Sequence, residues 1–186
     1  MNLQTAALGE SVDMVVPGHG FYREKILPLR DFHLDADGAT LTTTTSTNPG
    51  WTKVGTNMTG LAWAASKQVA CGYDFAVPDD YDALKDKLIV KLKLKMAGAT
   101  DTPTVTVAAY SDAASTTDLA PTALTALSAT ATWKEIDLSD NSIAAGDVIH
   151  FNLTPEAAHT TDAIELYGIK LKYKSDLAAH LRTSRS

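Results

Sequence analysis

The chain has 186 residues, of which 45% are hydrophobic, and its formal net charge is −6 at pH 7. This length suits one domain of ordinary size with an appendage. The acidic balance argues against nucleic-acid binding, which normally needs a basic surface, and the lack of a long apolar run excludes a transmembrane helix. A single cysteine, Cys71, excludes an internal disulfide and cysteine-cluster metal sites. Residues 1–14 lack the basic and apolar regions of a signal peptide, so we expect the protein to fold in the cytosol.

The N-terminal segment, residues 1–25, predicts an extended arm. It shows no sustained period of two or 3.6, and Pro17, Gly18 and Gly20 interrupt it. Its apolar residues are too numerous for a freely solvated tail. We therefore expect the arm to lie across its own domain or across a neighbouring subunit.

The rest of the chain predicts short strands separated by turns. Residues 84–96 carry the most regular alternation of apolar and polar side chains, which is typical of a strand with one face in a core. The expected strands cover residues 26–34, 51–54, 60–65, 84–96, 104–110, 133–138, 148–153 and 163–174. The expected turns cover residues 35–38, 48–50, 78–81, 140–142 and 145–147.

Two stretches need a more specific interpretation. Within residues 163–174 the apolar set changes parity at Tyr167–Gly168, which predicts a β-bulge. Residues 111–132 are small and polar, so we expect a long surface connection, with a short helix over 123–127 as the alternative. Together these elements predict an all-β antiparallel sandwich or barrel over residues 26–175, followed by a C-terminal tail over 176–186 that could form one or two helical turns.

No catalytic, cofactor-binding or metal-binding residue is predicted. The histidines at positions 19, 33, 150, 159 and 180 have no spacing that places two on one face, which leaves open only a site assembled across strands. Cys71 has no catalytic context and is expected to be a structural thiol. Asp35, Asp37 and Gly38, like Asp79 and Asp80, weakly resemble calcium loops, but turns explain both groups better. Since no paired carboxylates or triad can be recognised, we do not expect an enzyme.

Lysine and tryptophan patterns each allow two interpretations. One set of lysines alternates in residues 91–95 and another in residues 170–174. On exposed strands such lysines commonly prevent edge-to-edge aggregation, while the alternative is a basic patch that meets an acidic partner. Trp51, Trp63 and Trp133 could stack on sugars, but tryptophans in a sandwich more often belong to the core or an interface.

The order of these elements resembles the jelly-roll structural proteins of tailed bacteriophages, in particular capsid decoration proteins and head-fibre domains. The resemblance covers about residues 29–174. It is carried by Phe75-x-Val77-Pro78-Asp79-Asp80-Tyr81, the strand 87–96, Gly98-Ala99-Thr100-Asp101, Val105-Thr106-Val107-x-x-Tyr110, Ala145-Gly146-Asp147 before the strand to Leu153, and the loop 155–162.

This resemblance implies a single jelly-roll sandwich and a virion structural protein. Such a protein would bind the outside of the assembled head and stabilise it by clamping major capsid proteins non-covalently. The expected partners are the major capsid protein and two further copies in a homotrimer, with no nucleic acid and no membrane. The expected location is the capsid exterior, after synthesis in the host cytoplasm, with the arm 1–25 contacting the shell or a neighbour. The alternative is a carbohydrate- or receptor-binding fibre or adhesin module that uses Trp51 or Trp63.

Overall fold

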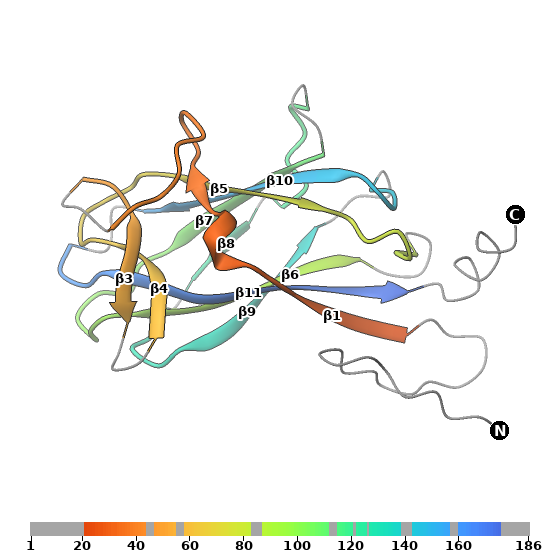
Figure 1. Cartoon of the computed structure of the whole chain (residues 1–186). Coiled ribbons are helices and arrows are strands. Elements are labelled where there is room, and N and C mark those ends of the chain that lie inside the picture. The colour runs from red at the N-terminus through yellow and green to blue at the C-terminus, as the bar shows by residue number, and fades with distance from the viewer. Residues whose placement is uncertain are drawn as a thin grey trace, which may run out of the picture.

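A computed structural model of the chain shows an all-β jelly-roll sandwich made of two antiparallel sheets that face each other (Figure 1). The structure describes residues 21–43, 47–54, 58–82, 87–111, 115–120, 122–125, 127–138, 143–156 and 160–175. In these ranges there is no helix long and apolar enough to cross a membrane. The fold class predicted from the sequence is confirmed.

The larger sheet has six strands in the order β3-β4-β11-β6-β9, and β1 pairs with β11 beyond β4. Its strands are β1 (Phe21–Leu27), β3 (Gly50–Val54), β4 (Met58–Trp63), β6 (Leu88–Met96), β9 (Thr132–Leu138) and β11 (Ile164–Ser175). In Figure 1 these strands form the lower layer, with β3 and β4 at its left end.

The smaller sheet has five strands in the order β2-β5-β10-β7-β8 and forms the upper layer of Figure 1. Its strands are β2 (His33–Leu34), β5 (Cys71–Ala76), β7 (Val105–Tyr110), β8 (Thr122–Leu124) and β10 (Val148–Pro155). A short 3₁₀ turn, η1 (Leu29–Asp31), separates β1 from β2.

The central strands β6 and β11 follow their sequence patterns closely. Every second residue of β6 is buried between the sheets, which is what a period of two requires of a half-buried strand. β11 pairs with β6 over most of its length, and the register shifts between Leu166 and Gly168. The β-bulge predicted at Tyr167–Gly168 is therefore confirmed.

Strand β5 is the main element that the sequence interpretation missed. Cys71, Tyr73 and Phe75 alternate into the core with exposed fractions of 0%, 1% and 5%, while Asp74 and Ala76 face outward. The alternation is present in the sequence, but it is short and follows a polar stretch. Its omission matters because β5 carries part of the polar cluster described below.

Three other segments differ from the sequence expectation. Residues 21–25 of the predicted arm belong to β1, which pairs along β11, whereas residues 1–20 lie outside the described residues. The single strand expected over 26–34 is divided, because Pro28 precedes η1 and β2 starts afterwards. Within 111–132 the structure places β8 and the buried side chains of Leu119, Leu124 and Leu127, so this segment contributes to the core. The tail 176–186 lies outside the described residues.

Two of the predicted turns depend on glycine. Gly38 has φ of 67° and Gly146 has φ of 86°, a region that favours glycine because it has no Cβ. In the first turn the Ala39 amide donates to Asp37 Oδ1 at 2.9 Å, and in the second the Ala144 amide donates to Asp147 Oδ2 at 2.7 Å. Both turns are confirmed where the sequence placed them.

Candidate functional site

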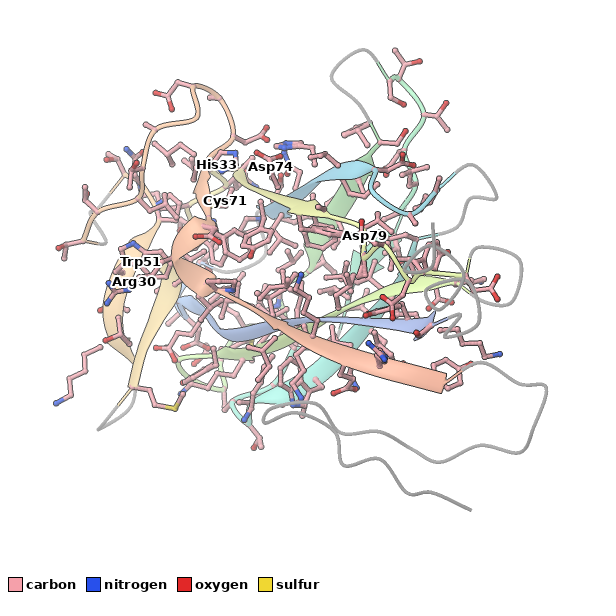
Figure 2. The ribbon with its side chains drawn as sticks, turned by 45° about the vertical axis from the view of Figure 1, so that its right-hand side comes forward. Arg30, His33, Trp51, Cys71, Asp74 and Asp79 are labelled. Atoms are coloured by element: carbon pink, nitrogen blue, oxygen red, sulfur yellow. The ribbon has the colours of Figure 1, made fainter. Side chains whose placement is uncertain are left out.

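An open cleft of about 500 Å³ lies beside β3 and η1. Among the residues that the structure describes, those that line it are Leu29, Arg30, Thr40, Trp51 and Thr59. Figure 2 shows Arg30 and Trp51 at the same end of the sandwich. These five described residues combine an indole ring and an aliphatic chain with a guanidinium and two hydroxyl groups, a mixture that is typical of small-molecule sites.

Trp51 is held in place by the segment that precedes its strand. Its Nε1 donates a hydrogen bond to the carbonyl oxygen of Leu41 at 3.0 Å, and its backbone amide donates to Thr42 at 2.6 Å. The ring is half-buried and packs against the core. A ring that is fixed on one side and lines a cleft can offer a surface to a ligand with little loss of side-chain entropy on binding.

The other two tryptophans differ from Trp51. Trp63 is only 1% exposed and its Nε1 donates to the Val69 carbonyl at 2.9 Å, so it belongs to the core and cannot stack on a sugar. Trp133 is 38% exposed on the outer face of the larger sheet, where Lys170 Nζ lies 4.9 Å from its ring centroid. Trp51 is therefore the tryptophan that the structure places in a cleft.

A second polar feature lies on the outer face of the smaller sheet. His33 on β2, Asp74 on β5 and His150 on β10 come from three adjacent strands, and their ligand-type atoms lie within 4.8 Å of one another. His150 Nδ1 lies 2.7 Å from Asp74 Oδ1, and His33 Nε2 lies 3.9 Å from Asp74 Oδ2. His150 Nε2 lies 2.8 Å from Asp35 Oδ1. Figure 2 shows His33 and Asp74 close together at the top of the molecule.

Strand register explains how these residues meet. Asp74 is paired with His150 across β5 and β10, and Gly72 is paired with His33 across β5 and β2. Since Gly72 and Asp74 are two residues apart on one strand, they share a face. A Cβ at Gly72 would lie 2.6 Å from His33 Nε2 and 2.7 Å from His150 Cε1, so only glycine leaves room for both rings.

The carboxylates around His150 favour its charged form. Partial burial alone would lower the pKa of His150, but hydrogen bonds with Asp74 and Asp35 outweigh it and raise the pKa above 6.5. The calcium-loop interpretation of Asp35 and Asp37 is not needed here, since Asp35 contacts His150 and Asp37 accepts the turn bond from Ala39.

Asp80 is also engaged by protein groups. It accepts hydrogen bonds from Tyr173 Oη at 3.1 Å and Ser175 Oγ at 2.5 Å, and it pairs with Arg23 at 3.1 Å. The turn predicted over 78–81 is confirmed by the bond from the Tyr81 amide to the Pro78 carbonyl. Asp80 thus joins this turn to β1 and β11 through side-chain contacts.

The two lysine sets meet on the outer face of the larger sheet. β6 and β11 are interior strands, so protection of a sheet edge does not explain their lysines. Within the described residues, five of these six lysines have acidic or aromatic partners. They are Lys91 with Glu24 and Glu135, Lys170 with Glu24 and Trp133, Lys172 with Glu135 and Tyr22, Lys174 with Tyr22, and Lys95 with Glu165 and Tyr167. Much of the positive charge is neutralised, which weakens the interpretation as a basic docking patch.

Comparison with known proteins gives a likeness in fold. No protein-family model and no curated protein matches the chain. The chain is similar in structure to the xylan-binding module CBM15, with a TM-score of 0.52 and 12% identity over 90% of this chain and 99% of that one. What the two share is the fold.

Weaker likenesses are to a CBM61 structure in complex with β-1,4-galactotriose and to a family 11 carbohydrate-binding module from Clostridium thermocellum. The first has a TM-score of 0.44 and 6% identity over 82% of this chain and 88% of that one. The second has a TM-score of 0.43 and 16% identity over 80% and 94%. These scores are too low to carry an argument.

The structural comparison overturns the capsid decoration function predicted from the sequence. The jelly-roll order that suggested a phage protein also occurs, over almost its whole length, in a xylan-binding module. The homotrimer and the virion location stay predictions that neither the structure nor the comparisons test.

Proposed function

We propose that the protein is a non-catalytic carbohydrate-binding module that holds a polysaccharide chain in the cleft beside Trp51. The observation that carries this proposal is the placement of Trp51, half-buried and anchored to Leu41, in the wall of an open cleft of about 500 Å³. The jelly-roll likeness to a xylan-binding module supports the fold on which such a site is built.

The cleft offers the chemistry that a sugar ring needs. One face of a pyranose carries C–H groups that can pack on the indole of Trp51, since aromatic rings combine large apolar area with fixed geometry. Arg30 supplies several N–H donors for sugar hydroxyls, and Thr40 and Thr59 can both donate and accept. Stacking would supply affinity, and the polar groups would orient the sugar.

Binding without cleavage is the better fit to this cleft. Glycoside hydrolysis normally requires two carboxyl groups on opposite sides of the scissile bond. Among the described residues that line the cleft there is no Asp or Glu. We therefore propose a binding role alone, and incubation with xylan should release no new reducing ends.

The first ligand to test is xylan, together with a panel of plant and bacterial polysaccharides. Affinity electrophoresis identifies the polysaccharides that retard the protein, and calorimetry with oligosaccharides then gives the affinity. We expect Trp51→Ala to weaken binding by about tenfold or more, equivalent to about 1.4 kcal/mol. Trp51→Phe, which keeps an aromatic face, should lose less.

The matched control is Trp133→Ala, because Trp133 is also partly exposed but lies on the outer face of the larger sheet. This variant should bind like the wild type. Circular dichroism and thermal unfolding would establish that each variant is folded. The proposal is abandoned if no polysaccharide binds, or if Trp51→Ala binds as tightly as the wild type.

A further inference from the structure

We propose that His33, Asp74 and His150 form a binding site for a divalent transition-metal ion of the Zn²⁺ type. The site lies on the outer face of the smaller sheet, and none of its three residues is among the described residues that line the sugar cleft. Two imidazole nitrogens and a carboxylate oxygen are donors that suit such ions, and a three-residue set leaves coordination positions for water or a ligand.

The ligand-type atoms of the three residues lie within 4.8 Å of one another, which is near the spacing of ligands around an ion. Zn²⁺ binds nitrogen and oxygen at about 2.0–2.2 Å, so neighbouring ligands in a tetrahedral site lie about 3.3 Å apart. Asp74 Oδ1 lies 2.7 Å from His150 Nδ1, and the other carboxylate oxygen, Oδ2, lies 3.9 Å from His33 Nε2, so the two separations bracket this value. The side chain of Asp74 is 55% exposed, so its rotation can bring both contacts toward the required value.

The remaining ring nitrogens face oxygen acceptors, as they do around metal-binding histidines. His150 Nε2 lies 2.8 Å from Asp35 Oδ1, which leaves Nδ1 toward Asp74. His33 Nδ1 lies 3.4 Å from the carbonyl oxygen of Asp31, which leaves Nε2 toward Asp74. Asp35 would thus act as a positioning residue that fixes the tautomer of His150.

Charge and space also fit a cation. The carboxylates of Asp35 and Asp74 lie beside the His150 imidazole, and a divalent ion would displace the ring proton and take over its role of balancing the negative charge. The missing side chain at Gly72 leaves the room that lets the rings approach from both sides of β5. Ca²⁺ requires six to eight oxygen ligands and should not bind here.

Calorimetry and thermal unfolding of chelator-treated full-length protein with ZnCl₂ test the site. We expect one ion per chain at this site with micromolar affinity and a rise in the melting temperature. His33→Gln/Asp74→Asn should lower the affinity at least 100-fold, and Asp35→Asn about 10- to 100-fold. CaCl₂ should have no effect at the same concentration.

The double variant also controls for zinc bound elsewhere, because it keeps the histidines at positions 19, 159 and 180, which lie outside the described residues. Zinc held by those residues would survive in the variant. In imidazole NMR spectra, Zn²⁺ should bind Nε2 of His33 and Nδ1 of His150. Trp51→Ala should leave the zinc affinity unchanged. Equal zinc binding by the wild type and the double variant, or no zinc binding by either, would overturn the proposal.

Discussion

Replacing Glu24 by Gln tests how strongly β1 is held to the larger sheet. Glu24 bonds Lys91 Nζ at 2.6 Å and Lys170 Nζ at 3.0 Å, so one carboxylate joins β1, β6 and β11. The side chains of Glu24, Lys91 and Lys170 are 28%, 16% and 27% exposed, which leaves them less screened than surface pairs. Two charge-assisted bonds, discounted for this solvent contact, give an expected loss of about 1–2 kcal/mol in the free energy of unfolding.

The pH dependence has a defined sign. The hydrogen bond with Lys91, and after it that with Lys170, lowers the pKa of Glu24 below 4.5, against the opposing effect of burial. A lowered folded-state pKa means that the stabilisation is complete above the unfolded-state value. It is lost as pH falls below about 4.5 and through the folded-state pKa. The difference between wild type and Glu24→Gln should therefore shrink progressively on acidification.

Urea unfolding followed by circular dichroism, at several values between about pH 7 and pH 3, measures this difference. The control is Asp137→Asn, since Asp137 pairs with Lys87 at 3.2 Å but their side chains are 49% and 56% exposed. That variant should lose less than about 0.5 kcal/mol. The reasoning is refuted if both variants lose equally at neutral pH, or if the Glu24→Gln deficit stays constant on acidification.

Two further predictions concern the loops and the core. In Gly98→Ala, the new Cβ would overlap the Asp162 carboxylate, which accepts hydrogen bonds from the amides of Thr100 and Asp101. Urea unfolding should therefore show a loss of about 2 kcal/mol in the free energy of unfolding. Ala97→Gly, at an exposed neighbouring position, is the control, and equal losses in the two variants would contradict the explanation. Burial raises the pKa of Cys71 to about 12. A thiol reagent should therefore not label the native protein at about pH 8 but should label it fully in denaturant. Rapid labelling of the native protein would show instead that β5, which carries Cys71, opens.

The strands could be predicted because burial on one face imposes a period of two on the sequence. This signal is strongest in β6 and β11, and it even located the bulge through its change of parity. It was too short to identify β5, where Cys71, Tyr73 and Phe75 alternate. Without β5, the place of Asp74 between two histidines could not be inferred.

The polar cluster itself is not a sequence motif. His33, Asp74 and His150 meet only because β2, β5 and β10 are neighbours in a particular register. Histidine spacing along the chain carries no information about such a site, since each ligand comes from a different strand. The sequence could only leave open a site assembled across strands, while Gly72 gave no sign that it made room for two rings.

The phage resemblance identified the architecture correctly but led to the wrong function. Its evidence was the order and spacing of turns and strands, which is a property of jelly rolls in general. One fold carries many functions, and function depends on the side chains grafted onto it. Arg30 and Trp51, to which we propose that a sugar binds, lie outside the motifs on which the resemblance was based.

The short segment 29–35 connects the two proposed sites. Leu29 and Arg30 line the cleft, while His33 and Asp35 belong to the polar cluster. Between them Phe32 is only 1% exposed and packs on Tyr73 with ring centroids 4.7 Å apart, so the middle of the segment is fixed in the core. Because Phe32 fixes the segment between its two ends, a substitution in the cleft need not displace the histidines. A loss of sugar binding and a loss of zinc binding can therefore be assigned to different ends of one segment.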